Sequence, residues 1–125
     1  MKELTKAEQQ VMQYLWKLKA AYLKDIVDEY PEPRPAYTTI STVVNVLVKK
    51  GFIDYELHGK SRQYRPAVSK DKYMKQTFRG MLDSFFDNST RQFASFFAQK
   101  TELTVEELKE IRALIDEQIQ KDNDR

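Results

Sequence analysis

Hydrophobic residues recur at helical spacing over much of the chain, most regularly between positions 37 and 50. The apolar positions there follow the i, i+3, i+4, i+7, i+8 pattern that gathers side chains on one broad face of a helix. The opposite face carries small hydroxyl and amide side chains and a lysine. Gly51 comes next, and a glycine at this point favours the left-handed backbone that ends helices. The pattern predicts an amphipathic helix whose apolar members are Ile40, Val43, Val44, Leu47 and Val48.

Two predicted helices and a proline-rich connector precede this segment. Thr5 and Glu8 have the spacing of a capping box, in which each side chain bonds a free backbone amide at a helix start. After the helix that follows, we expect a turn at residues 19–21 and a shorter helix over 22–30. Three prolines between 31 and 35 forbid its continuation. The order helix, helix, tight loop, helix is that of a helix-turn-helix unit, with the last helix in the recognition position.

After Gly51 the apolar period changes to two. Residues 52–57 read as a half-exposed strand, residues 58–61 as a turn with a glycine, and residues 62–65 as a second strand that Pro66 ends. A hairpin directly after a recognition helix is a wing. We therefore predict a mainly α fold with a small β-hairpin, in which residues 1–68 form an N-terminal winged helix-turn-helix domain and residues 69–125 form a C-terminal three-helix region.

The second half of the chain is rich in aromatic residues, because six of the seven phenylalanines lie between positions 78 and 97. A domain of about 60 residues covers only about 60% of the surface of its unfolded chain, so this region cannot bury its aromatic load alone. Packing against the first domain is one explanation. We favour a two-fold homodimer, whose dimerisation residues are expected to be Phe78, Met81, Leu82, Phe85, Phe86, Phe93, Phe96, Phe97, Leu108, Ile111 and Ile115.

Composition excludes several kinds of chemistry. The chain has no cysteine and a single histidine, His58, so disulfides, thiolate metal sites and cysteine catalysis are ruled out. We expect no metal and no cofactor, and no enzyme, because no nucleophile is paired with a base and no glycine loop is suited to phosphate. No apolar run approaches the roughly 20 residues of a membrane span, and the N-terminus lacks a signal core. We therefore expect a cytoplasmic protein with no membrane insertion.

The net charge of +2 conceals a stronger local excess. Between residues 34 and 65, six basic side chains stand against two acidic ones, which suits a surface that faces phosphate groups. Hydroxyl and amide groups can meet base edges as well as phosphates. The expected contacts with double-stranded DNA are Thr38, Thr39, Ser41, Thr42, Asn45 and Lys49 in the helix, and Lys60 and Arg62 in the hairpin. The alternative is a winged-helix module that binds a protein and has no sequence-specific contact with DNA.

Residues 4 to about 75 resemble the winged-helix domain of the penicillinase-repressor family, the bacterial repressors of beta-lactamase and methicillin-resistance genes. The matching pieces are LTKAE at 4–8, LW at 15–16, AYTTIST at 36–42, LVKKGFI at 47–53, GK at 59–60 and YRP at 64–66. The resemblance implies a homodimeric repressor whose helix at 37–50 enters the major groove of a palindromic operator, with the wing at 52–65 on the flanking backbone. More loosely, it extends to a three-helix dimerisation region.

This sequence departs from the family pattern at several points. Where members often carry an arginine, it has Val46, so the contacts of that arginine are missing. In antibiotic-responsive members, a membrane sensor-protease system triggers cleavage between the asparagine and phenylalanine of an Asn-Phe-Ala stretch. The corresponding stretch is Phe96-Phe97-Ala98, so the resemblance implies a cleavage site at Phe96 and Phe97 with the asparagine replaced. Copper-responsive members of the family sense the metal through a cysteine cluster near the C-terminus. That mechanism is excluded here, because the chain has no cysteine.

Overall fold

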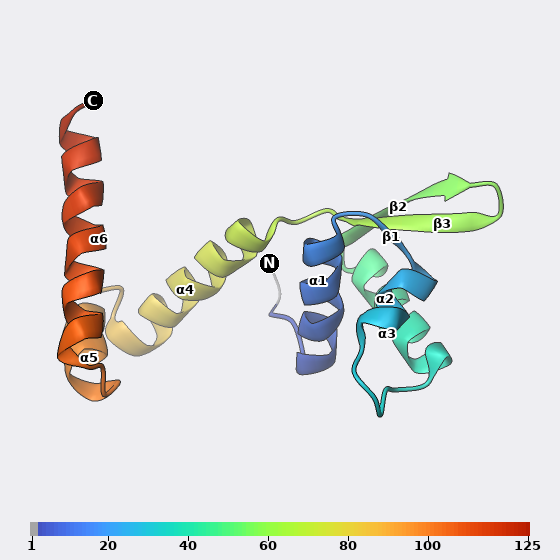
Figure 1. Ribbon diagram of the computed structural model, residues 1–125, viewed down its shortest axis with the longest axis horizontal. Coiled ribbons are helices and arrows are strands. Elements are labelled where there is room, and N and C mark those ends of the chain that lie inside the picture. Colours follow the sequence, from blue (N-terminus) through green and yellow to red (C-terminus); the bar gives the residue numbers. More distant parts are fainter. Residues whose placement is uncertain (1–2) are drawn as a thin grey trace. The chain divides into compact units, whose positions relative to one another are not determined.

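The computed structural model describes residues 3–125 and divides them into two compact units, with the division between Phe78 and Arg79 (Figure 1). The first unit contains three helices and a small sheet and ends within the fourth helix; the second is helical. The predicted fold class is thereby confirmed. In chain order, the elements are α1 Lys6–Leu18, β1 Ala21–Tyr22, α2 Leu23–Glu29, α3 Tyr37–Lys49, β2 Ile53–His58, β3 Ser61–Pro66, α4 Lys70–Phe86, α5 Thr90–Lys100 and α6 Val105–Asn123.

The core of the first unit lies between the three helices and the sheet. Helix α3 contributes the apolar face that its spacing predicted, because it buries Ile40, Val44 and Leu47 while Val43 and Val48 pack at the edge of the core. The predicted capping box at the start of α1 is present, with Thr5 and Glu8 bonding each other's backbone amides. The fully buried side chains of largest volume are Met12, Leu15, Ile26, Ile40, Leu47, Ile53, Val11 and Val44.

The sheet has three strands in the order β1-β3-β2, all antiparallel to their neighbours. The expected two-stranded hairpin is therefore completed by a third strand, which the sequence assigned to a turn at 19–21 and to the start of a helix. Ala21 pairs with Tyr64 and Tyr22 with Gln63, so α2 begins only at Leu23. This pairing joins segments about forty residues apart, and no local pattern of two residues predicts it.

Helix α4 is shared between the two units. Tyr73, in its first turns, lies in the core of the first unit beside Trp16 and Phe52, and its hydroxyl accepts a hydrogen bond of 3.0 Å from the Leu4 amide. The sequence placed the domain boundary between residues 68 and 69, whereas the compact units divide ten residues later, inside α4. The N-terminal turns of α4 therefore belong with the winged-helix unit.

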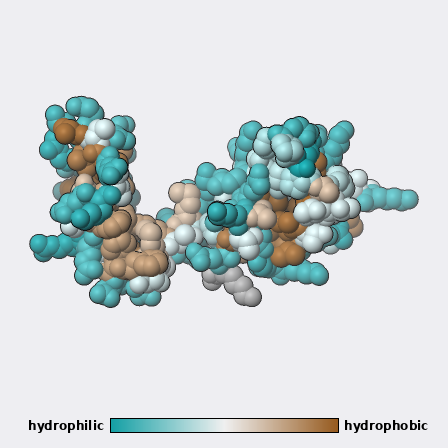
Figure 2. Space-filling model, turned by 90° about the horizontal axis from the view of Figure 1, so that it is seen from below, coloured by the Kyte–Doolittle hydropathy of each residue, from teal (hydrophilic) through white to brown (hydrophobic). Residues whose placement is uncertain are grey.

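The second unit leaves most of its apolar surface uncovered. Phe86 contacts the rings of Phe93 and Phe96, and Phe93 stacks on Phe97. Even so, neither α5 nor α6 buries a single residue. Figure 2 shows apolar atoms gathered on the face of this unit, at the left of the view. Among the helices of residues 3–125, none has the length and apolar character of a membrane-spanning segment.

Candidate nucleic-acid interface

Helix α3 is fixed at its C-terminal end by a hydrogen-bonded cap. The Gly51 amide donates to the Val48 carbonyl (3.1 Å) and the Phe52 amide donates to the Leu47 carbonyl (3.0 Å). This is the Schellman arrangement, and it requires the left-handed backbone that Gly51 adopts with φ of 85°. The prediction that the helix ends at Gly51 is confirmed. Together with its buried apolar face, the cap sets which side of α3 faces solvent.

The polar face of α3 is exposed at almost every position that the sequence assigned to DNA. Thr38, Thr39, Thr42, Asn45 and Lys49 are exposed, and Ser41 is half-buried at the edge of the face. The Thr42 hydroxyl donates a hydrogen bond of 2.9 Å to the Thr38 carbonyl within the same helix. A row of short polar groups on one exposed helix face has the size and the chemistry to meet base edges and phosphates in a major groove.

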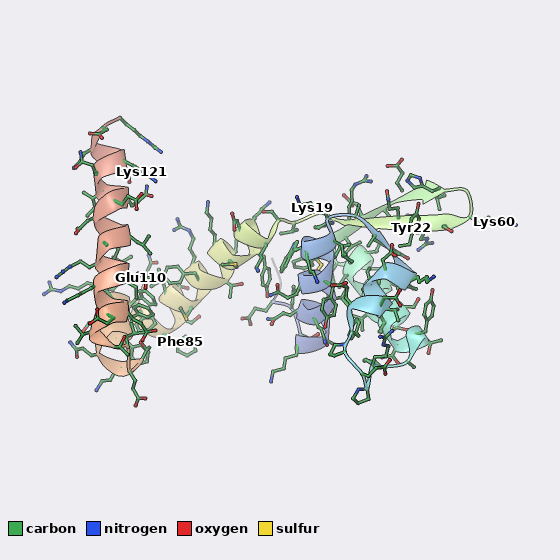
Figure 3. The ribbon with its side chains drawn as sticks, viewed as in Figure 1. Lys19, Tyr22, Lys60, Phe85, Glu110 and Lys121 are labelled. Atoms are coloured by element: carbon green, nitrogen blue, oxygen red, sulfur yellow. The ribbon has the colours of Figure 1, made fainter. Side chains whose placement is uncertain are left out.

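The hairpin after α3 places a basic side chain at its tip. His58 pairs with Ser61, so the turn consists of Gly59 and Lys60 alone. Gly59 has a positive φ of 65° at the first central position, as type II′ turns require, and the twist of such turns matches that of the strands. Lys60 points away from the end of the hairpin into solvent (Figure 3).

The two faces of the hairpin differ in charge. On one face, the Arg62 guanidinium carbon lies 4.3 Å from the centre of the Tyr55 ring, and that ring contacts Tyr64 edge-on. On the other face, Glu56 pairs with Arg65 at 3.2 Å and lies 3.7 Å from His58. Arg65 is therefore held by a carboxylate, whereas Arg62 is held by an aromatic ring that leaves its charge available.

Ion pairing separates the six basic side chains between residues 34 and 65 into two groups. Lys50 binds Glu8 at 2.7 Å, Arg34 lies 3.1 Å from Glu32 and 3.7 Å from Asp28, and Arg65 is paired as above. For the other three, the described part of the chain supplies no carboxylate within 4.0 Å. These side chains, which we call the free cations, are Lys49, Lys60 and Arg62. They are the basic residues that the sequence assigned to phosphate contacts.

The Glu8 carboxylate connects the start of α1 to the end of α3. Burial disfavours its charge, but the hydrogen bond and charge of Lys50 and the backbone amide of Thr5 outweigh burial and hold the pKa of Glu8 below its ordinary value. The sequence identified Glu8 as a cap only. Its pairing with Lys50, 42 positions away, removes that lysine from the set available to DNA.

The residues assigned to dimerisation fall into three groups by exposure. Phe85 is 79% exposed, Ile115 54% and Phe96 50%, while Phe78 and Met81 are each 37% exposed. Leu82 is already buried within the single chain. The half-buried members are Phe86, Phe93, Phe97, Leu108 and Ile111. The bond between Phe96 and Phe97 lies inside α5, with helix on both sides.

The described residues contain no cluster of three or more side chains able to hold a metal ion. The exposed polar groups of α3 and the free cations of α3 and the wing make up the candidate interface.

Relatives of this chain include proteins named as a regulatory protein and as a repressor. It is 28% identical to the methicillin resistance regulatory protein MecI of Mammaliicoccus sciuri, over 90% of this chain and 93% of that protein. It is 22% identical to the penicillinase repressor of Bacillus licheniformis, over 92% of this chain and 91% of that protein.

Two solved structures share the architecture of the first unit. The DNA-binding domain of the repressor BlaI matches 58% of this chain and 94% of its own length, with 26% identity and a TM-score of 0.51. The monomeric form of Bacillus licheniformis BlaI, in complex with the blaP half-operator, covers the same share of this chain and 89% of its own length, with 25% identity and a TM-score of 0.50. The predicted winged-helix architecture is thus confirmed.

The family model described as penicillinase repressor matches residues 4–117, which include α3, the wing and most of the second unit. The resemblance seen in the sequence therefore extends over nearly the whole chain, and the chain belongs to the penicillinase repressor family.

Proposed function

We propose that this protein is a transcriptional repressor that binds operator DNA through α3 and the wing. The observation that carries the proposal is the exposed face of hydroxyl and amide groups on α3, together with the free cations Lys49 on that helix and Lys60 and Arg62 on the hairpin. Family membership supports it, as does the likeness of the first unit to a repressor solved with its half-operator. No feature of the described residues suggests an enzyme. Such a protein works in the cytoplasm, where bacterial DNA lies.

The two kinds of side chain have separate roles in this proposal. The free cations bind phosphate oxygens on either side of the groove, which fixes the position of the protein and contributes affinity for any sequence. The short polar groups Thr38, Thr39, Ser41, Thr42 and Asn45 lie toward the bases and supply discrimination between sequences. Ser41, which is half-buried, contributes from the edge of this face.

The second unit completes the proposal as a homodimerisation region. Its exposed phenylalanine and isoleucine side chains match what a second copy of the chain would cover, and a two-fold dimer presents two α3 helices to the two halves of a palindromic operator. We propose the dimerisation residues given above, with Leu82 in the core beneath the contact surface.

We further propose that repression is relieved by cleavage at Phe96–Phe97 through a membrane sensor-protease system, as in the antibiotic-responsive members that the sequence resembles. Because this bond lies inside α5, its backbone must leave the helix before a protease can bind it. Mass spectrometry of the repressor from induced cells tests the idea. An intact chain during full induction would contradict it.

Binding to DNA is tested by fluorescence anisotropy with the promoter of its own operon and with a random duplex of equal length. We expect Thr42→Ala and Asn45→Ala to lower the ratio of operator to random affinity, because they remove groups that face bases. Lys60→Ala should weaken both affinities by a similar factor, because phosphates are common to both duplexes.

Lys121→Ala is the matched control, since it removes the same charge from an exposed site in the second unit. It should leave both affinities unchanged. Equal affinity of the wild-type protein for the two duplexes would refute the proposal and favour the alternative, a winged-helix module that binds a protein partner.

A further inference from the structure

Val46 is an apolar side chain on the face of α3 that the proposed function turns toward DNA. It is 37% exposed, and helical spacing places it between Thr42, four residues before it, and Lys49, three residues after it. Thr39 lies two turns earlier on the same side. The surface around Val46 can therefore reach the same bases as the neighbouring polar groups, but Val46 itself offers only methyl groups.

Thr42 has less polar capacity than its type suggests. A threonine hydroxyl carries one proton, and here that proton is given to the Thr38 carbonyl at 2.9 Å. The side chain of Thr42 retains a methyl group and the lone pairs of Oγ1, so it can accept a hydrogen bond from a base but has no proton left to donate. Val46 and Thr42 together form a surface of methyl groups with one acceptor and no donor.

For such a surface, the two types of base pair differ in the major groove by one apolar group. An A·T pair presents one donor, the N6 amino group of adenine, two acceptors and the thymine 5-methyl group. A G·C pair likewise presents one donor, the N4 amino group of cytosine, and two acceptors, but it has no methyl group. Val46 can pack on the thymine methyl while Thr42 Oγ1 accepts from adenine N6.

We propose that Val46, with Thr42, makes this protein select A·T pairs in its operator by contact with the thymine 5-methyl group. This inference rests on the proposed function. It adds to that function the chemical group of the operator that the protein recognises. An arginine at position 46 would favour guanine acceptors, so the valine gives this chain a different base preference.

The test begins with selection of duplexes from a random-sequence library by the full-length protein. The enriched duplex is then synthesised with thymine and, one position at a time, with deoxyuracil, which lacks only the 5-methyl group. We expect at least one position in each half-site at which deoxyuracil weakens binding about three- to fivefold, the effect of one methyl-sized apolar contact. Thymines in the flanks should show no difference.

Val46→Ala should abolish the difference in affinity between the thymine and deoxyuracil duplexes at that position. Val46→Ala and deoxyuracil combined should reduce the affinity no more than either change alone. Val105→Ala, an exposed valine in α6, is the matched control and should keep the full difference. Thermal unfolding of each variant checks that the fold is intact.

The outcomes separate the two proposals. If no sequence is enriched, the proposed function fails. If a sequence is enriched but every thymine can be replaced without loss, or if Val46→Ala keeps the uracil effect, the repressor proposal stands and the methyl contact is refuted.

Discussion

Arg62 shows how a wing residue can be held in place without losing its charge. Its guanidinium lies 4.3 Å from the centre of the Tyr55 ring, and Tyr55 is supported in turn by the buried Tyr64. A carboxylate partner would fix the side chain but cancel its charge, as Glu56 does for Arg65. We infer that Tyr55 acts as a positioning residue for a phosphate contact by Arg62.

Replacing Tyr55 with leucine should weaken DNA binding about two- to fivefold, because exposed cation–π contacts contribute about 0.5–1 kcal/mol. Tyr55→Phe keeps the ring and should bind as the wild type does. Anisotropy titrations of both variants on the same duplex measure the difference. In the background of Arg62→Ala, Tyr55→Leu should have no further effect; an equal loss there would show that the ring acts by another route.

At the scale of single residues, the sequence predicted which side chains share a face of α3 but not which side chains form ion pairs. The polar face of α3 could be identified because helical spacing alone determines which side chains share a face. The ion pairs of Lys50 and Arg65 could not be identified from the sequence. Their partners, Glu8 and Glu56, become neighbours only when the helices and strands pack. Assignment of the DNA contacts themselves remains a prediction.

Glu8 is the point at which two helices depend on each other. Its carboxylate caps α1 through Thr5 and binds Lys50 at the end of α3, so the orientation of the recognition helix relative to α1 rests partly on this pair. Glu8→Gln keeps a side chain that suits the capping box but removes the charge. We expect it to lower the free energy of unfolding by about 1.5–3 kcal/mol at pH 7, the scale of a hydrogen bond to a charged group.

The loss should depend on pH in a defined direction. Because the folded protein lowers the pKa of Glu8, the stabilisation is complete above the ordinary carboxyl pKa of about 4.5 and disappears as the pH falls through the lower folded value. Urea unfolding of wild type and Glu8→Gln at a series of pH values should therefore converge in acid. A gap that stays constant down to pH values well below about 4.5 would contradict the assigned role of the charge.

At the scale of elements, long periodic segments were predictable and the short strand was not. Local hydrogen bonds form the capping boxes of α1 and α6 and end α3 at Gly51. Such features can be predicted because the residues that form them are close together in the sequence. Strand β1 exists because Ala21 and Tyr22 pair with β3, and two residues carry no periodicity to reveal that. The position of Tyr73 in the core of the first unit could not be predicted from the sequence either, because an aromatic residue on one face of a helix can pack in either unit.

The proposed dimer makes a prediction for the whole molecule. Phe85 is the most exposed of the assigned dimerisation residues, so a charge there should cost little in a single chain but much when a second copy covers it. We expect Phe85→Asp to lower the dimer fraction at least about tenfold in sedimentation equilibrium, since burying an unpaired charge costs several kcal/mol.

Tyr37→Asp, at an exposed aromatic of the first unit, is the matched control and should leave the oligomeric state unchanged. If Phe85→Asp and Ile115→Asp both remain dimeric with wild-type dissociation constants, the second unit does not form the interface in the way proposed.

The division of basic side chains between carboxylates and solvent determines how DNA binding responds to dissolved ions. Each phosphate neutralised on duplex DNA releases condensed counterions and contributes about −0.9 to the slope of log affinity against log salt concentration. With only Lys49, Lys60 and Arg62 active in each half of a dimer, this segment yields a slope of about −5, whereas all its basic residues together would yield about −11. Titration in potassium chloride distinguishes the two values. Because Glu8, Glu32, Asp28 and Glu56 already hold the other cations, the affinity of the repressor for its operator should change less with ionic strength than the affinity of a fully charged surface would.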